Sequence, residues 1–379
     1  MTSKKILVIT SRYPFPVRGG DKLRIAEIMK HLSKKNKIDL VSIGKKTKKI
    51  KFLNKQYLFN NNSLQKIFQI FKSFIKNEPL QIGLFKIPEM KKKIMEISMN
   101  YDVIIFHLIR SAYYLPNNYS GKKILEMTDL ISKNYLTVYE NLNNLNLLKW
   151  LYSYEKKKLE KFEQIYSKKF DHVVLVNKKD LKNSKIKKNN IKIIGNGTII
   201  KKNIYINKRI KNNVIFFGNI NSLANRNACV DFIDNYLPKI KLVYPNIEFK
   251  ILGNCSPILK FFFRLKGVTV YSNINNLSDH SKNTLAGICN VNIQSGLQNK
   301  ILDYTSIGIP VLCNQKSNNF KFLKKKDLLV YENDFSFMTN FHKLMKNKKF
   351  VENISKKCFH KTSKYYDWKN ILTKYSSII

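Results

Sequence analysis

The residues best suited to chemistry lie in one segment, Ile293 to Cys313, which reads IQSGLQNKILDYTSIGIPVLC. An apolar run leads into a glycine-containing turn, and a predicted helix follows the turn. Its candidate ligand contacts are Gly296, Leu297, Gln298, Asn299, Lys300 and Asp303. Free amides at a helix N-terminus favour anions, and Lys300 in the first turn adds a full positive charge. Asp303 can accept hydrogen bonds from ribose hydroxyls, so the pattern favours a nucleoside diphosphate, although its spacing is also that of an ordinary strand-turn-helix unit.

A second group of candidates lies in the first half of the chain. A loop rich in proline and glycine ends at Gly19 and Gly20, and Asp21 is the predicted N-cap of the next helix. His107 and Arg110 follow one predicted strand, whereas Glu126 and Asp129 end the next strand. Because ligands of open α/β sheets bind outside the carboxyl ends of the strands, we expect these side chains to lie at a binding site.

The elements that position these residues alternate between apolar strands and helices. A helix is predicted from about Arg226 to Val243. The predicted strands are Ile6–Ile9, Ile38–Ile43, Tyr101–Phe106, Lys123–Met127, His172–Val176, Val214–Phe217, Glu248–Leu252, Val268–Tyr271, Gly287–Ile293 and Pro310–Cys313. This alternation predicts an α/β chain of two doubly wound parallel-sheet domains that face a cleft. The predicted division is residues 1–205, residues 206–364, and a C-terminal helix at 365–379 that crosses back to the first domain.

The segment from Leu64 to Ile75 is strongly amphipathic, with aromatic residues on one side and lysines interleaved. It predicts either an ordinary helix that faces the core or a helix that lies in a membrane interface. The two alternatives differ in where the apolar side points.

Charge and cysteine content narrow the class of protein. The chain of 379 residues has 70 Lys and Arg against 25 Asp and Glu, a net charge of +45. Only seven residues are arginine, and proteins that read base edges favour arginine, so we expect no specific nucleic-acid partner. The excess of lysine is the pattern of an A+T-rich coding sequence, so we attribute most of the positive charge to codon bias. A lysine-rich face can also bind an anionic membrane, which is the further partner we expect. The five cysteines form no C-x-x-C pair and predict free thiols.

The apolar run near Met1 spans only five residues, from Ile6 to Thr10, which is too short for a signal peptide. No stretch approaches about 18 uninterrupted apolar residues. We therefore expect a cytoplasmic protein whose contact with the inner face of the membrane is peripheral.

The segment from Ile293 to Cys313 resembles the donor-site signature of glycosyltransferase family 4, and is closest to the branch that reads G-x-Q-N-K-x-L-E. The two glutamates of the wider family correspond to Ser295 and Asp303 in this chain. Aspartate at the second position keeps a carboxylate for the ribose on a shorter side chain, whereas the first position has lost its acid.

Further segments are similar to the same family in the same order along the chain. They are Arg12–Pro16 with Gly19, Gly20 and Arg24; His107 after its strand; Glu126 to Asp129, in place of L-D-x-x-D; Gly195–Gly197; Gly218 to Asn225; and Trp368. The family's arginine and lysine in the loop after Gly218 are absent, which leaves Lys300 and Arg226 to neutralise a diphosphate. These matches cover nearly the whole chain.

The resemblance implies a retaining glycosyltransferase with the GT-B fold that uses a nucleotide sugar such as a UDP- or GDP-sugar, without a metal or other cofactor. In that interpretation His107, Lys300 and Arg226 are catalytic. The donor-binding residues are Gly19, Gly20, Gly218, Asn225, Gly296, Leu297, Gln298, Asn299 and Asp303. Arg110, Glu126 and Asp129 lie on the side of a glycan or lipid-linked acceptor, as in cell-envelope polysaccharide synthesis.

Two alternatives remain open from the sequence. A nucleotide-sugar epimerase or hydrolase on the same fold would need acid-base carboxylates, for which Glu126 and Asp129 are the candidates. A non-catalytic basic protein that binds membranes or nucleic acids would owe its binding to charge and would be strongly sensitive to salt.

Overall fold

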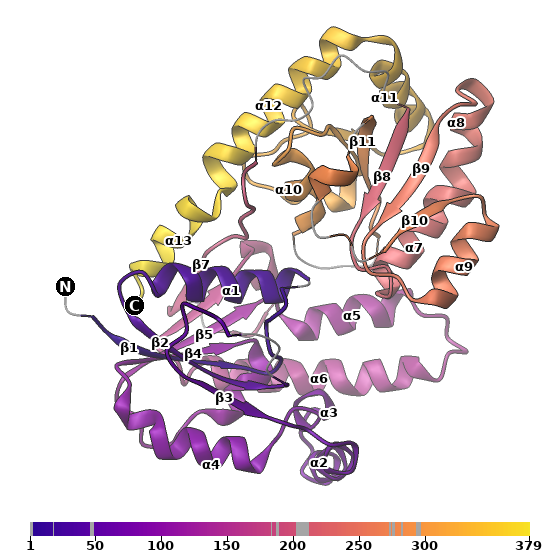
Figure 1. The fold of residues 1–379 in the computed structure, drawn as a ribbon. Coiled ribbons are helices and arrows are strands. Elements are labelled where there is room, and N and C mark those ends of the chain that lie inside the picture. Colours follow the sequence, from indigo (N-terminus) through magenta and orange to yellow (C-terminus); the bar gives the residue numbers. More distant parts are fainter. Residues whose placement is uncertain are drawn as a thin grey trace. The chain divides into compact units, whose positions relative to one another are not determined.

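The computed structural model of the protein describes residues 3–17, 19–45, 49–182, 184–186, 189–201, 212–272, 274, 277–281, 283–292 and 297–379. The chain forms two compact units (Figure 1), the first of Met1–Gly195 with Leu372–Ile379 and the second of Asn196–Ile371. The predicted division between residues 205 and 206 falls in the segment 202–211, outside the described residues.

The first unit is built on a seven-stranded parallel sheet with the strand order β3-β2-β1-β4-β5-β6-β7. Its strands are β1 (Lys5–Thr10), β2 (Lys37–Ile43), β3 (Gln56–Phe59), β4 (Val103–His107), β5 (Lys122–Thr128), β6 (His172–Leu175) and β7 (Ile191–Ile193). Ile6 on β1 pairs with Ile38 on one side and with Val103 on the other. The central strands are buried on both faces, as their continuous apolar sequences require.

Helices cover both faces of this sheet, with α1 on one side and α4 on the other (Figure 1). They are α1 (Gly20–Leu32), α2 (Ser63–Ile75), α3 (Leu80–Gly83), α4 (Pro88–Ile97), α5 (Ile131–Asn141) and α6 (Leu148–Ser167), with short helical turns at Ser98–Asn100, Ile109–Tyr114 and Lys178–Leu181. The N-cap of α1 is Gly19, so the prediction of Asp21 as the cap was wrong. Asp21 instead lies in the first turn, where a carboxylate favours the helix dipole.

The second unit has a six-stranded parallel sheet with the order β10-β9-β8-β11-β12-β13. Its strands are β8 (Asn213–Phe217), β9 (Glu248–Leu252), β10 (Thr269–Tyr271), β11 (Thr284–Cys289), β12 (Val311–Asn314) and β13 (Leu329–Tyr331). The helices are α7 (Leu223–Asp231), α8 (Leu237–Val243), α9 (Pro257–Leu265), α10 (Asn299–Thr305), α11 (Asp334–Lys346) and α12 (Lys348–Tyr366), with short turns at Leu277–His280 and Gln315–Ser317. The single helix predicted up to Val243 is α7 and α8 joined by a π-helical turn at Phe232–Tyr236.

The C-terminal segment is two helices, because the helical conformation breaks at Asp367 between α12 and α13 (Trp368–Ser376). At the break, Thr198 N–H donates to Tyr366 O at 2.7 Å, and Trp368 packs on Gly197, where a Cβ would lie 2.6 Å from the indole. The last residues belong to the first unit, in which Ile379 O accepts from Lys4 Nζ at 2.8 Å.

Two parallel sheets with helices on both sides confirm the predicted doubly wound α/β class. All five cysteines are buried and free, as predicted. In the described part of the chain, no helix combines the length and apolarity needed to cross a membrane.

Candidate functional site

The second unit places Lys300 in a compact polar cluster with two other predicted site residues. Its ammonium donates to Asn225 Oδ1 at 3.0 Å and to Gln298 Oε1 at 3.2 Å, and it lies 5.0 Å from the centre of the Phe216 ring. Lys300 is 8% exposed. Both of these hydrogen bonds, the ones it makes with described residues, are to neutral oxygens. Neither acceptor compensates the positive charge, so the cluster is suited to an anion.

The loop between β8 and α7 sets the position of Asn225. Ser222 caps α7 by accepting from Asn225 N–H, and the Asn225 amide donates to Asn219 O at 2.8 Å. The loop can approach β9 because residue 253 is glycine: a Cβ there would lie 2.0 Å from Gly218 O, and its φ of +136° disfavours other residues. Gly218 therefore contributes backbone geometry at the end of β8.

The short helix α10 carries Lys300, and Tyr304 fixes its position against the sheet. The Tyr304 hydroxyl accepts from Phe217 N–H at 2.7 Å, and its ring lies over Gly287 of β11, where a Cβ would come within 2.4 Å. Glycine at 287 thus sets the distance between α10 and the sheet.

Asp303 lies on the same helix in a buried environment. Burial raises the pKa of its carboxyl group to about 7, with Lys300 and Lys201 opposing the shift. The group is therefore divided between its protonated and ionised forms near neutral pH. A bound cationic or hydroxyl partner would favour the ionised form.

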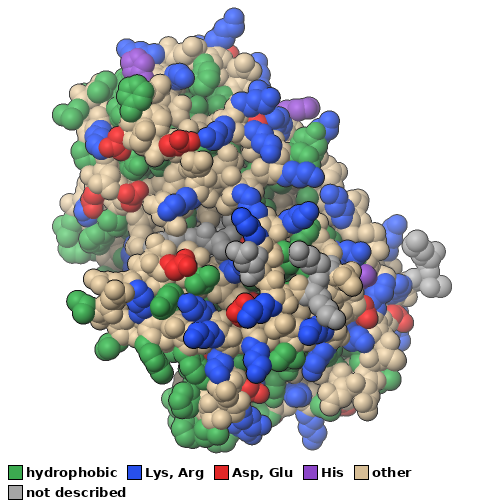
Figure 2. Space-filling model, turned by 180° about the vertical axis from the view of Figure 1, so that it is seen from behind, with side chains coloured by type: hydrophobic (Ala, Val, Ile, Leu, Met, Phe, Trp, Pro, Cys, Tyr) green, Lys and Arg blue, Asp and Glu red, His purple; other side chains and the backbone are tan. Residues whose placement is uncertain are grey.

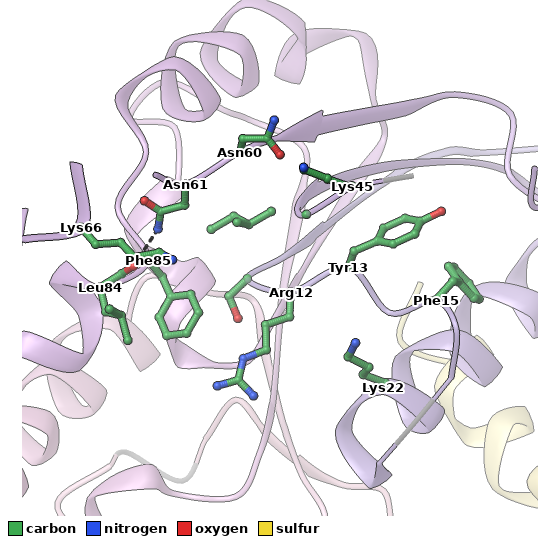
Figure 3. A pocket seen from close by; sticks show the side chains of 13 residues that line it. Arg12, Tyr13, Phe15, Lys22, Lys45, Asn60, Asn61, Lys66, Leu84 and Phe85 are labelled. Carbon is green, nitrogen blue, oxygen red and sulfur yellow. Dashed lines mark hydrogen bonds between the residues drawn. The ribbon is translucent and has the colours of Figure 1, made fainter. Parts of the chain in front are cut away.

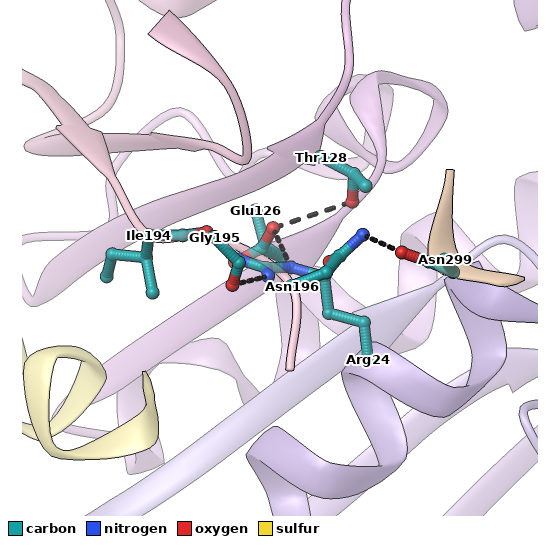
Figure 4. A network of polar contacts seen from close by, with 7 residues as sticks. All are labelled: Arg24, Glu126, Thr128, Ile194, Gly195, Asn196 and Asn299. Carbon is teal, nitrogen blue, oxygen red and sulfur yellow. Dashed lines mark hydrogen bonds and ion pairs between the residues drawn. The ribbon is translucent and has the colours of Figure 1, made fainter. Parts of the chain in front are cut away.

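The other predicted donor residues have different surroundings. Asn299 Oδ1 accepts from Asn196 Nδ2 at 2.9 Å, so this side chain holds the turn at the start of the second unit (Figure 4). Leu297 packs against the apolar core of the unit. Gly296 and Ser295 lie outside the described residues.

Arg226 does not join the Lys300 cluster. It lines a separate cavity of about 530 Å³ together with Asp231, Asp234 and Phe262. Adjacent residues of a helix point about 100° apart, so Asn225 faces Lys300 while Arg226 faces elsewhere. The structure therefore does not support the predicted catalytic role of Arg226.

In the first unit, Glu126 is a buried partner of Arg24 (Figure 4). Arg24 Nε and Nη2 donate to the two carboxylate oxygens at 2.9 and 3.2 Å, and Arg24 also donates to Gly195 O and Ile194 O at 2.8 and 2.9 Å. Glu126 is 0% exposed. Its predicted place beside the acceptor is corrected: the side chain joins β5 to α1 and is closed to solvent.

His107 and Arg110 lie near one another at the end of β4. Burial lowers the pKa of His107 to about 3, with Asp21 opposing the shift and Arg24 and Arg110 adding to it. The imidazole is therefore neutral at physiological pH, and its Nδ1 has no hydrogen-bond partner among the described residues. Burial and Arg12 lower the pKa of Arg110 to about 10.

The remaining first-unit candidates occupy the ends of β1 and β5. Gly19 has a φ of +97° and is followed by Gly20, the first residue of α1. Asp129 follows β5, and its carboxyl pKa rises to about 7 through burial and the nearby Asp180. In the described chain, no group of three or more His, Cys, Asp or Glu side chains could hold a metal ion.

The sequence did not indicate a cavity of about 550 Å³ in the first unit (Figure 3). Its lining combines basic, polar and apolar side chains from six segments of the chain: Ser11, Arg12, Tyr13, Phe15, Lys22, Ile43, Gly44, Lys45, Asn60, Asn61, Lys66, Leu84 and Phe85. Arg12 lies in a segment that carried the family resemblance, but the lysines come from unrelated segments. Only the folded chain brings them together.

No protein-family model and no curated protein sequence matches the chain. Solved structures resemble it over nearly its full length. Sucrose-phosphate synthase from Thermosynechococcus elongatus is 11% identical with a TM-score of 0.72, covering 99% of this chain and 98% of the other. HepE from Anabaena, in complex with UDP and glucose, is 10% identical with a TM-score of 0.70 and the same coverage. The glycosyltransferase WaaG, involved in lipopolysaccharide biosynthesis, is 11% identical with a TM-score of 0.69, covering 99% of both chains.

The chain has the GT-B fold. At these identities the likeness is one of architecture, so the roles of individual residues depend on the geometry of this chain. Within its GT-B fold the second unit gathers Asn225, Gln298 and Lys300, with Asp303 on the same helix.

Proposed function

We propose that the protein transfers a sugar from a nucleotide-sugar donor to a glycan or lipid-linked acceptor. The observation that carries the proposal is the Lys300 cluster, a nearly buried ammonium held by two neutral amide oxygens at the strand ends of a GT-B unit. Structures of similar fold support it, since HepE was solved with UDP-glucose and TarM of S. aureus with UDP and α-GlcNAc-glycerol.

The chemistry that follows from these side chains is stabilisation of charge. When the bond between sugar and diphosphate breaks, negative charge develops on the diphosphate, and a preorganised ammonium stabilises it most where water is excluded. Lys300 is the group we assign to that task, and Asp303 is assigned to the ribose hydroxyls. A neutral His107 can exchange hydrogen bonds with hydroxyls of the donor sugar without bringing a second charge.

We further propose retention of configuration and independence from metal ions. Retention is what the resemblance of the donor segment to a retaining family implies. In the reaction we propose, the leaving diphosphate accepts the proton of the acceptor.

The competing epimerase hypothesis needs two available carboxyl groups, and Glu126 is occupied by Arg24. Asp129 alone would have to serve as both acid and base, which makes transfer the better supported activity.

Contact with an anionic membrane is the second part of the proposal, and α2 carries it. Its apolar side points away from the unit: Leu64, Ile67, Phe68, Phe71, Phe74 and Ile75 are each at least half exposed. The polar residues Gln69 and Ser73 are the ones buried, because Ser73 packs against Gly83 of α3. Of the two predictions for this segment, the core-facing helix was wrong, and an exposed apolar face flanked by lysines fits a lipid headgroup layer.

The test is a thermal-shift measurement with UDP, GDP and ADP, at 0.1 M and 0.5 M salt, on the wild type and two variants. Lys300→Met removes the ammonium and keeps much of the side-chain volume. Lys241→Met, on the exposed side of α8, is the matched control. We expect one nucleotide to raise the melting temperature of the wild type and of the control at both salt concentrations. The affinity of Lys300→Met for that nucleotide should be at least about tenfold lower, because charge-assisted hydrogen bonds contribute about 1.5–3 kcal/mol.

Two results would contradict the proposal. Equal stabilisation by every anion that disappears in 0.5 M salt would mean that surface charge alone responds. Unchanged nucleotide affinity in Lys300→Met would show that the Lys300 cluster is not the diphosphate site.

A further inference from the structure

The first-unit cavity has more lysine and arginine in its lining than any of the other described cavities. Four of its lining residues are cationic, namely Arg12, Lys22, Lys45 and Lys66, and none of its described lining residues is acidic. The cavity beside Arg226, by contrast, has two aspartates. Figure 3 shows these cations distributed around the cavity, with Phe85 and Leu84 on one side.

A lysine-rich sequence would give lysine-lined cavities by chance, but arginine is rare in this chain. Arg12 and Arg110 are two of only seven arginines, and both guanidinium groups lie over the Phe85 ring, at 5.5 and 4.8 Å from its centre. Two like charges at one ring repel each other, and Arg12 contributes to the lowered pKa of Arg110. An anion bound beside them would offset this repulsion.

No ion pair with a described residue involves Arg12, Lys45 or Lys66. Their charges are therefore not neutralised by a described carboxylate, although each lines a concave surface where field lines concentrate. This is the electrostatic arrangement of a site for an anion.

Two buried polar atoms in the wall have no hydrogen-bond partner among the described residues. They are Ser11 Oγ, on a residue that is 1% exposed, and Asn61 Oδ1. The Asn61 amide nitrogen is already used, donating to Leu84 O at 2.9 Å (Figure 3). Buried polar atoms are normally paired, so both are suited to hydroxyl groups of a ligand.

We propose that this cavity binds the acceptor and that the acceptor carries a phosphate beside its hydroxyl groups. The inference rests on the proposed function and deepens it by naming the acceptor class, a phosphorylated sugar or polyol. Arg12, Lys22, Lys45 and Lys66 bind the phosphate, while Ser11 and Asn61 bind hydroxyls. Phosphate suits the site better than a single carboxylate because several donors can share its three terminal oxygens, and 550 Å³ lies in the range of small-molecule pockets.

The experiment measures binding by calorimetry at 0.15 M salt with glucose 6-phosphate, glucose, glucuronic acid and water-soluble dihexanoyl phosphatidic acid. The variant is Lys45→Ala/Lys66→Ala, and the matched control is Lys72→Ala, which removes an exposed lysine from the same helix as Lys66 but not from the cavity. Melting temperatures check that all three proteins are folded. UDP binding is measured in parallel on the same samples.

We expect wild type and Lys72→Ala to bind a phosphate-bearing probe at least about tenfold more tightly than glucose or glucuronic acid, and Lys45→Ala/Lys66→Ala to lose about tenfold or more of that affinity. Tighter binding of glucose 6-phosphate identifies a sugar-borne phosphate, and tighter binding of phosphatidic acid a lipid-borne one. If neither glucose 6-phosphate nor phosphatidic acid binds more tightly than glucose, or if the variant and the Lys72→Ala control lose equal affinity, the inference is overturned. If UDP still binds in that case, the proposed transferase function stands; if UDP fails to bind while the phosphate probe binds, the donor assignment fails instead.

Discussion

Asp303 is the side chain whose titration gives the most direct test of the second-unit site. Burial raises its pKa from 3.8 to about 7, so the folded protein holds this proton more tightly than the unfolded chain. Its contribution to stability is therefore full below about pH 4 and is lost as the pH rises through 7. We expect the melting temperature of the wild type to fall between pH 5 and pH 8, and that of Asp303→Asn to fall less.

The control for this measurement is Asp279→Asn, at an exposed aspartate of the same unit. It should retain the pH dependence of the wild type. An Asp303→Asn profile parallel to that of the wild type would mean that the Asp303 carboxyl group does not titrate near neutral pH.

The Arg24–Glu126 pair leads to a prediction about stability. Both side chains are almost completely buried, and removing one charge leaves the other without compensation. We expect Glu126→Leu to lower the free energy of unfolding of the first unit by about 3–5 kcal/mol, and Arg24→Leu/Glu126→Leu to lower it less than the single change. Urea unfolding measures both.

Equal stability of Glu126→Leu and wild type would contradict this role and would return Glu126 to the candidates for chemistry.

The sequence could predict those parts of the site whose residues lie close together along the chain or at the ends of neighbouring strands. Gln298 and Lys300 lie two residues apart in one segment, and Asn225 follows the strand beside it, so pattern and resemblance found all three. Glu126 was misassigned because its partner Arg24 is 102 residues away and nothing in the local pattern shows that the two are paired. The first-unit cavity was not predicted because its lysines come from α1, α2 and the end of β2, and only the sheet topology brings these segments together.

Among the elements, the long buried strands were predicted, and of the shorter strands β6, β10 and β12 were predicted whereas β3, β7 and β13 were not. β1, β4 and β8 are continuous apolar runs, which is the signature of a parallel strand covered on both faces. β3, β7 and β13 have only four, three and three residues, and most of their residues are not fully buried. Strands that short have too few positions to show a period.

The direction of α2 could not be predicted from its amphipathic sequence, because an apolar stripe fits a core and a membrane equally well. In the structure α2 packs through its small polar side on α3, and the aromatic contact of Phe74 with Tyr154 extends the exposed apolar surface to α6. Figure 1 shows α2 beside α3, next to α6. The exposed face is therefore larger than one helix.

We expect Phe68→Ser to weaken binding to vesicles of phosphatidylglycerol and phosphatidylcholine by about fivefold or more, since moving a large apolar side chain out of water contributes about 1.5–3 kcal/mol. Phe335→Ser, at a phenylalanine of α11 in the second unit that is more exposed than Phe68 (82% against 61%), is the control and should bind as the wild type does. Flotation of the vesicles measures the bound fraction. Equal losses in the two variants would mean that α2 is not the membrane contact.

The net positive charge of the whole molecule attracts every anion. Its contribution to binding therefore has to be distinguished from that of the individual sites. Figure 2 shows basic side chains spread widely over the visible surface, with few acidic ones between them. Because most of these charges are exposed lysines, salt screens them strongly: the Debye length is about 10 Å at 0.1 M and about 3 Å at 1 M. Lys300 is only 8% exposed, so salt screens its charge much less.

Salt therefore separates the two kinds of binding. Between 0.1 M and 0.5 M salt, we expect the fraction bound to vesicles with phosphatidylglycerol to fall several-fold, because each lysine near an anionic surface contributes about 1 kcal/mol only when unscreened. The affinity for UDP or its counterpart should change by less than about threefold over the same range, because the Lys300 ammonium is shielded from bulk ions. Vesicle flotation and calorimetry on one protein preparation give both values. A parallel loss of nucleotide and vesicle binding would assign both to the basic surface, and the nucleotide would then have no dedicated site at Lys300.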